Sequence, residues 1–365
     1  MEFMQITKLL LSKGASFAAY RLPGDDTVSF VVQKEGEVKR EAFGCLDHAG
    51  GFAAAPFDSC RDGKLYLISP DIVFSAGDFH KVKNEIENIE KQSINFGKKN
   101  VETDKKSYLR QVEKTVSQIR SGELKKVVLS RYFSVAFNSV LTAELFKGLV
   151  NGYPTAFVYL LYIPREGLWT GATPEILLKK LDKRYVTMAL AGTQSYSANL
   201  KWENKEIEEQ GFVADFIENV LKSVAVTEYE KLPSETVKAG KLAHLRTVFK
   251  IDAEALTGKT AKTVGLLHPT PAVGGLPQKE ACDVIEKTEK HHRRLYTGFL
   301  GPWNLNGESS LFVNLRCAEI YSDSIGLYVG GGITAGSLPE KEWQETVDKS
   351  KTMLSVVKKL RTFAP

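Results

Sequence analysis

The sequence has only four cysteines, and their positions suggest neither a bridge nor a metal site. They are Cys45, Cys60, Cys282 and Cys317, with no Cys-x-x-Cys pair and no cluster of His and Cys. Closely spaced cysteines are the usual signature of structural zinc and of disulfide-rich secreted folds. Their absence argues against both, and a reducing cytoplasm is the compartment that we expect.

Long apolar runs are missing as well. No segment approaches the ~20 apolar residues that a helix needs to cross a bilayer. Near the N-terminus the run from Leu9 to Leu11 is flanked by Lys8 and Lys13, and it is too short for the apolar part of a secretory signal. We therefore expect a protein that is neither exported nor embedded in a membrane.

Neither sign of charge dominates the chain. Lys and Arg number 49 and Asp and Glu number 44, so the formal excess is only +5. The basic residues are spread along the sequence rather than gathered in an arm or stripe, which argues against a nucleic-acid partner. No heptad run indicates a coiled-coil partner, and we expect a monomer.

Apolar residues, in contrast, are plentiful enough for a large core, since 43% of the 365 residues are hydrophobic. No Pro- or Ser-rich linker divides the chain, so we expect one domain over residues 1–365. Residues 1–100 mix short strand-like runs with turns and carry no recognisable chemistry. We interpret them as scaffold.

Hydrophobic periodicity predicts an α+β fold. Helical spacing marks residues 103–121, 198–223, 278–292 and 340–360. Strand-forming residues mark 126–137, 156–163, 175–180, 185–190, 309–320 and 326–329. Because the long helices come in separate blocks rather than after every strand, a doubly wound parallel sheet is disfavoured.

One acid stands where the helix over 198–223 should be apolar. The stripe through Val213 and Ile217 leads back along the same face to Glu209. A buried carboxylate needs a cation or a cluster of donors. The alternative is that Glu209 reaches solvent or pairs with a nearby lysine.

The helix over 340–360 repeats the pattern, because Glu342, Glu345 and Lys349 share one face. Oxygen ligands from two helices would suit Mg²⁺, which prefers one or two carboxylates with water and substrate oxygens. Alternatively, Glu345 and Lys349 form an ordinary i,i+4 ion pair at the surface.

Two basic residues fall on strand faces that should be buried. Lys126 shares a face with Val128 and Ser130, where burial would make it a candidate general base; an exposed edge lysine is the alternative. Alternation over 309–320 places Arg316 between apolar neighbours. Such an arginine holds a carboxylate or phosphate, which could belong to a ligand or to the protein.

Three turns offer further candidates. Glu175 follows Gly-Ala-Thr-Pro, a turn that can bring a catalytic acid close to a ligand. Gly192 and Thr193 end another strand and could hold a carboxylate through backbone N–H groups, although an ordinary turn explains them equally well. The run 330–332 is all glycine but lacks the G-x-G-x-x-G spacing, so we interpret it as a wall for a small anion.

The remaining histidines suggest no chemistry of their own. His291 and His292 stand beside Arg293 and Arg294 in what reads as a polar helix end, and we expect these side chains to be solvated. His268, in His-Pro-Thr-Pro, is expected to shape a loop rather than to touch reacting atoms.

Taken in order, these segments resemble the chorismate-utilising enzymes, which include isochorismate, salicylate, anthranilate and aminodeoxychorismate synthases. The resemblance covers about residues 103–360 as a catalytic core. It rests on Lys126-Val-Val-Leu-Ser-Arg131, Gly171-Ala-Thr-Pro-Glu175, Leu190-Ala-Gly-Thr193, Glu206 to Glu209, His244-Leu245, His268-Pro-Thr-Pro-Ala272, Leu315-Arg-Cys-Ala318, Gly330-Gly-Gly332 and Glu342-Trp-Gln-Glu-Thr346. It implies a large two-sheet β core flanked by helices.

The resemblance also implies a reaction. Lys126 stands where the family's water-activating base is found, and anthranilate synthases lack a lysine there, so no amidotransferase subunit is expected. Ala272 is similar to the isochorismate synthases, since relatives that eliminate pyruvate tend to have Thr at this position. The expected activity is therefore a Mg²⁺-dependent isochorismate synthase with Lys126 as base and Glu175 as acid, and a salicylate synthase is the alternative.

The remaining roles come from the same resemblance. Glu209 and Glu345 would bind Mg²⁺, with Glu206 and Glu342 as supporting acids. The substrate chorismate would be held by a larger set of residues: Arg316, Tyr296, Lys349 and Gly330 around one carboxylate, and His244, Thr193, Gly192 and Ala272 along the pocket.

Three positions depart from the family pattern: Gln194 in place of Arg, Gln210 in place of His and Val273 in place of Leu. They bear on rate and specificity rather than on class. The sequence does not distinguish a menaquinone from a siderophore pathway.

Overall fold

The computed structural model describes residues 2–197, 200–239 and 242–362. Two large antiparallel sheets form its centre. The first runs, in spatial order, β15 (Gly275–Leu276), β7 (Lys126–Ala136), β19 (Ser324–Ile333), β18 (Cys317–Ile320), β9 (Gly167–Thr173), β8 (Phe157–Ile163), β1 (Ser16–Arg21), β2 (Ser29–Gln33) and β6 (Ile72–Ser75).

The second sheet has ten strands in the described chain, one more than the first. Its order is β12 (Glu230–Lys231), β14 (Leu242–Asp252), β11 (Arg184–Ser195), β10 (Ile176–Leu181), β17 (Ser310–Val313), β16 (Phe299–Trp303), β4 (Gly51–Ala55), β5 (Lys64–Ile68) and β3 (Arg40–Ala42), and β13 (Glu235–Ala239) also pairs with β14.

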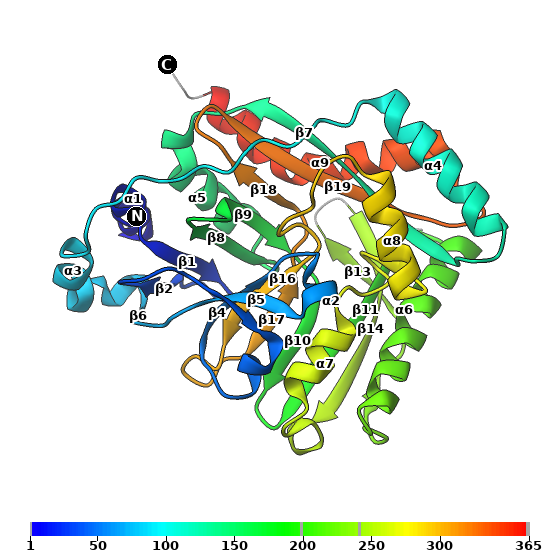
Figure 1. Ribbon diagram of the computed structural model, residues 1–365, viewed down its shortest axis with the longest axis horizontal. Coiled ribbons are helices and arrows are strands. Elements are labelled where there is room, and N and C mark those ends of the chain that lie inside the picture. Colours follow the sequence, from blue (N-terminus) through cyan, green and yellow to red (C-terminus); the bar gives the residue numbers. More distant parts are fainter. Residues whose placement is uncertain (1, 198–199, 240–241, 363–365) are drawn as a thin grey trace.

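Helices flank the two sheets (Figure 1). They are α1 (Glu2–Lys13), α2 (Ser59–Asp62), α3 (Phe79–Glu87), α4 (Lys105–Arg120), α5 (Thr142–Gly152), α6 (Asn204–Ser223), α7 (Thr260–Leu267), α8 (Gln278–Thr288) and α9 (Pro339–Thr362).

Alternation along β8 shows how the layers form. Tyr159 and Leu161 face the second sheet, and Val158 and Leu160 face the opposite way, because successive side chains of a strand point to opposite sides. Between the sheets the rings of Phe157 and Phe312 stack with centroids 4.2 Å apart. Both faces of β8 are therefore buried, which explains its continuous apolar sequence.

The outer faces of the sheets are covered by different helices. Helices α1, α5 and α9 pack on the first sheet, and α6 and α7 pack on the second. Helices α4 and α8 pack with β7 and β19 near the β15 edge of the first sheet. The result is a sandwich of helix, sheet, sheet and helix, and the prediction of an α+β fold with a two-sheet core is confirmed.

The N-terminal residues are integral to both sheets. Strand β1 pairs with β8 and β4 pairs with β16, so this scaffold supplies central strands rather than a separate unit. Helices α1 and α3 were not expected from the sequence.

The prediction of one strand over 309–320 is wrong. The chain leaves the second sheet after β17 and enters the first at β18. Arg316 takes the left-handed conformation, with φ of 50°, in the crossover. Apolar residues stand on both sides of Asn314 to Arg316, so the sequence does not mark the point where the backbone passes from one sheet to the other.

Two helices are shorter than expected. Helix α6 begins at Asn204 rather than at 198, and residues 198–199 lie outside the described chain. Helix α8 ends at Thr288 because Glu289 has an extended backbone, with ψ of 136°. Its carboxylate then accepts a hydrogen bond from the Ser130 N–H at 2.7 Å.

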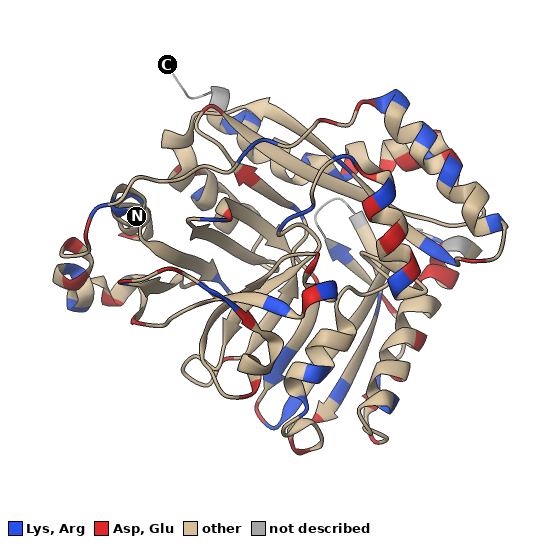
Figure 2. Cartoon of the chain, viewed as in Figure 1, with Lys and Arg blue, Asp and Glu red and all other residues tan. Residues whose placement is uncertain are grey.

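Charges of both signs are mixed along α8 and the surface loops (Figure 2), as the composition suggests. Among the described residues, no helix combines the length and apolar character that a membrane span requires.

Candidate active site

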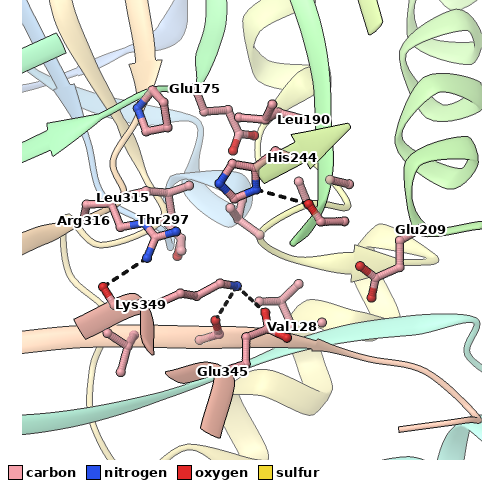
Figure 3. A pocket seen from close by; sticks show the side chains of 18 of the residues that line it. Val128, Glu175, Leu190, Glu209, His244, Thr297, Leu315, Arg316, Glu345 and Lys349 are labelled. Atoms are coloured by element: carbon pink, nitrogen blue, oxygen red, sulfur yellow. Dashed lines mark hydrogen bonds and ion pairs between the residues drawn. The ribbon is translucent and has the colours of Figure 1, made fainter. Parts of the chain in front are cut away.

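One pocket collects residues from both sheets and from helices α6 and α9 (Figure 3). The residues singled out from the sequence that line it are Lys126, Glu175, Gly192, Glu209, His244, Ala272, Tyr296, Arg316, Gly330, Glu345 and Lys349. Positions more than 200 residues apart thus meet in one place, because β7 and β19 are paired neighbours in the first sheet.

Two of the expected residues, Glu206 and Glu342, are not among the described residues that line the pocket. Glu206 lies behind Gly192, and Glu342 lies beside Gly331. The side chain of Thr193 falls outside the described part of the chain, although its backbone pairs with His244 in the second sheet.

The side chains of Lys126 and Glu209 both lie beside Gly332. Lys126 opens β7 and is only 2% exposed. A methyl group on Gly332 would lie 2.8 Å from the Lys126 Cε and 2.8 Å from the Glu209 Oε1. Both residues are buried, so the solvated alternatives for Lys126 and Glu209 are wrong, and a side chain at position 332 would crowd both groups.

Replacing Gly332 by alanine is expected to lower kcat/KM by about 100-fold, since a displacement of about 1 Å in an active site can have that effect. The matched control is Gly336→Ala, because a methyl group there meets nothing within 4 Å. Steady-state kinetics and a thermal melt of both variants would check this. Equal activity of the two variants would show that Gly332 does not position Lys126 and Glu209.

Glu175 is a buried carboxyl at the start of β10. It is 3% exposed, and its backbone carbonyl accepts the Val313 N–H at 2.9 Å. Burial raises the pKa of Glu175 to about 8, against the opposing effect of the positive charges on Lys126 and Lys349. Glu175 is thus largely protonated at neutral pH, the state that a general acid needs.

The predicted i,i+4 ion pair between Glu345 and Lys349 is present, but its setting differs from the expected one. The Lys349 Nζ lies 2.6 Å from the Glu345 Oε1, so the i,i+4 ion pair is present. The pair is not at the surface, however, because both residues line the pocket and Lys349 also donates to the Gly330 carbonyl at 2.9 Å. Glu345 is held at the pocket wall next to the glycine strand.

Arg316 and His244 add polar groups between Glu175 and Glu345 (Figure 3). The Arg316 Nη1 donates to the Lys349 carbonyl at 3.0 Å. Burial, with the charges of Arg316 and Lys349, lowers the pKa of His244 to about 3, so the ring is neutral. The His244 Nδ1 lies 3.1 Å from the Gly192 carbonyl, which can only accept, so the proton is on Nδ1.

The donor set is compatible with a hard cation. Within residues 2–197, 200–239 and 242–362 no group of three or more His, Cys, Asp or Glu side chains is arranged to hold a metal. Glu209 and Glu345 nevertheless bring two carboxylates to one pocket from different helices. Mg²⁺ takes one or two carboxylates and completes its shell with water and substrate oxygens, so these residues fit it.

Some pocket residues were missed from the sequence, notably Tyr328 and Thr297. Tyr328 stacks on Tyr296, with ring centroids 5.4 Å apart. It stands two residues before Gly330 in the same strand, and two-residue alternation could have placed it on the pocket face.

The departures from the family pattern have structural roles. Gln210 donates to the Ala189 carbonyl at 3.1 Å and to Thr247 at 3.0 Å, so it fastens α6 to the second sheet. Gln194 donates to Glu206 at 3.4 Å, and Val273 lines the pocket.

The solvated assignment of the 291–294 cluster is wrong for all but His292, since the half-buried Arg294 is paired with the buried Glu319. His291 is 5% exposed and its Nε2 lies 2.9 Å from the Ser130 Oγ. Arg293 is 4% exposed and pairs with Glu289 at 2.6 Å. His268 is buried and within 3.2 Å of the Phe57 carbonyl, consistent with a role in shaping its loop.

Comparisons with known proteins show the family to which the chain belongs. Residues 72–358 match the family described as "Chorismate binding enzyme". The chain is 30% identical over 320 residues to the isochorismate synthase DhbC of Bacillus subtilis, covering 82% of this chain and 79% of DhbC. It is 27% identical over 315 residues to the isochorismate synthase EntC of Escherichia coli, covering 83% and 80%.

A solved structure supports the fold. MenF, the menaquinone-specific isochorismate synthase of Escherichia coli, superposes with a TM-score of 0.76 at 23% identity, over 95% of this chain and 91% of MenF. The family match spans more than three quarters of the sequence and includes every pocket residue named above. The chain is therefore an enzyme that belongs to the chorismate-binding family.

Proposed function

We propose that this enzyme is a Mg²⁺-dependent isochorismate synthase. The observation that carries the proposal is the pairing, in one pocket, of a buried lysine at position 126 with a carboxyl at position 175 whose pKa is raised to about 8. Glu175 can deliver a proton at neutral pH, and the amine of Lys126 in its uncharged form can accept one from water. The names of DhbC and EntC support the same reaction.

The basic side chains of the pocket would bind the carboxylates of the substrate. Chorismate carries two carboxylates, and besides Lys126 the described lysine and arginine residues that line the pocket are Arg316 and Lys349. The Arg316 guanidinium would hold the enolpyruvyl carboxylate. Neutral His244 would line the ring without adding charge.

The reaction is a transposition of a hydroxyl group. Lys126 takes a proton from water while the water oxygen bonds to C2 of the ring. Glu175 gives its proton to the C4 hydroxyl, which leaves as water while the double bonds shift between the two carbons. One water enters and one leaves, so isochorismate is an isomer of chorismate.

Glu209 and Glu345 would hold Mg²⁺ against the ring carboxylate. When bound, the ion would withdraw electrons from the conjugated ring and stabilise negative charge in the transition state. Lys349 already holds the Glu345 side chain in the pocket, with its Nζ 2.6 Å from Oε1.

The direct test is product analysis of purified protein with chorismate and Mg²⁺, with EDTA as the metal-free control. We expect isochorismate without pyruvate, and loss of turnover with EDTA. Salicylate with pyruvate would instead identify a salicylate synthase. An amino product formed with added ammonia, or no turnover at all, would overturn the proposal.

The metal assignment predicts a change in Mg²⁺ dependence. Glu209→Gln is expected to raise the Mg²⁺ concentration for half-maximal rate by about tenfold or more, because an amide is a weaker ligand than a carboxylate. Glu208→Gln is the control, since Glu208 is its exposed neighbour on α6. A Mg²⁺ titration with unchanged midpoint in the Glu209 variant would place the ion elsewhere.

A further inference from the structure

A second cavity, of about 490 Å³, lies outside the active site. It is lined by the segment that contains α2 and by residues from α8 to Arg294. Two of its residues, Cys60 and Cys282, are 222 positions apart in the sequence and are both free thiols.

The two sulfurs are in contact. The Cys60 Sγ–H donates to the Cys282 Sγ at 3.9 Å. Cys60 lies on the four-residue helix α2, and Cys282 lies on α8. The two sulfur atoms of a disulfide are about 2.0 Å apart. Rotation of the two side chains, with a small movement of α2, would bring the sulfurs to this distance.

The surroundings shift the pKa values of the two thiols in opposite directions. The hydrogen bond from Cys60, with the positive charges of Arg293 and Arg61, lowers the pKa of Cys282, and the same hydrogen bond together with burial raises the pKa of Cys60. Cys282 is therefore the nucleophile of the pair, since the thiolate is the reactive form.

The other two cysteines lack these features. Burial raises the pKa of Cys45, and Cys317 is 1% exposed in the centre of the fold. Neither contributes to the second cavity.

We propose that Cys60 and Cys282 form a peroxide-sensitive dithiol that closes to a reversible disulfide between α2 and α8. The Cys282 thiolate attacks one oxygen of hydrogen peroxide, so that an S–O bond forms, the O–O bond breaks, and hydroxide leaves and is protonated to water. The Cys60 sulfur then loses its proton and attacks the Cys282 Sγ. The S–S bond forms as the S–O bond breaks, and a second water leaves.

The disulfide would fix the position of α8, which lies next to β7, the strand that begins with Lys126. The Ala281 side chain, beside Cys282, packs against Gly275, and Gly275 pairs with Val127 next to Lys126. Helix α8 therefore connects the dithiol to the strand that begins with Lys126.

The test is a thiol count on full-length protein before and after sub-millimolar hydrogen peroxide. Wild type is expected to lose two of its four thiols, to run as a single chain on a non-reducing gel, and to regain both thiols with dithiothreitol. Trypsin leaves Cys45 and Cys60 in one peptide, residues 41–61, so the bridge should be mapped in Cys45→Ser. There we expect peptide 41–61 joined to peptide 280–287.

Two further variants test the order of events. Cys60→Ser should stop at a sulfenic acid on Cys282 that dimedone traps, and Cys282→Ser should lose the Cys60 thiol at least tenfold more slowly. Circular dichroism would verify that both variants are folded. The proposal is overturned if four thiols persist in wild type, if the bridge involves Cys45 or Cys317, or if oxidation yields only dimers linked between chains.

Discussion

Replacing Lys126 by alanine is expected to lower kcat by about 1,000-fold with little change in KM, because a positioned general base contributes about 10² to 10⁴ in rate. Lys126 is 2% exposed and lines the pocket beside Glu209 and Gly332. Truncating it leaves Arg316 and Lys349 in place to bind the substrate. Initial rates of isochorismate formation across a range of chorismate concentrations would separate the two parameters.

A second substitution distinguishes a base from a positive charge. Lys126→Arg keeps the charge, but a guanidinium does not give up its proton in proteins, so this variant should be as inactive as the alanine variant. A purely electrostatic role would instead leave most of the activity in the arginine variant.

The neighbouring lysine supplies the matched control. Lys125 is exposed and takes part in the fold through its backbone N–H, which donates to the Leu276 carbonyl at 2.8 Å. Lys125→Ala should therefore have the activity of wild type. The reverse reaction gives an independent check, because loss of the base must slow both directions by the same factor if the equilibrium is unchanged.

Local periodicity accounts for the elements that sequence reasoning placed well. The stripe on α6 is apolar because Val213 and Ile217 pack on the second sheet, and following it back one turn leads to Glu209 in the pocket. The apolar pattern of an amphipathic helix indicates which face is buried, so an acid on that face can be recognised from the sequence. The residues that contact this acid cannot be recognised in the same way, because they belong to other elements.

The crossover at Arg316 shows where local patterns fail. Apolar residues on both sides are buried in different sheets, and the sequence has no glycine or proline at the point where the chain passes between them. The left-handed backbone of Arg316 is imposed by the surrounding fold. Its side chain reaches the pocket, as predicted, but not through alternation along one strand.

Buried polar clusters are the other source of error. Arg293 looked like part of a solvated helix end, yet it donates to the Val128 and Val273 carbonyls at 2.6 and 2.9 Å as well as to Glu289. A charge can be buried when its donors are all satisfied. Partners supplied by remote backbone carbonyls leave no trace in the local sequence.

Replacing Glu175 by glutamine should lower kcat by about 100-fold or more, because the amide cannot deliver a proton to the departing hydroxyl. The wild-type rate should fall as pH rises through about 8, where Glu175 loses its proton. That limb of the pH profile should be missing from the residual activity of the glutamine variant. A wild-type limb displaced to the ordinary range of a carboxyl group would show that Glu175 is not the acid.

Glu175→Gln is expected to lower activity but to raise stability at high pH. The folded pKa of Glu175, about 8, lies above the ordinary value of 4.5, so between these two pH values the unfolded chain has released a proton that the folded chain still holds. The free energy of unfolding therefore falls as pH rises through this window, by about 1.4 kcal/mol for each pKa unit. Glutamine is neutral at every pH, so Glu175→Gln should be more stable than wild type at pH 9 and similar to it at pH 4. Urea unfolding at both pH values would test this. A variant that is inactive but more stable than wild type at high pH would show that the buried carboxyl of Glu175 serves the reaction rather than the stability of the fold.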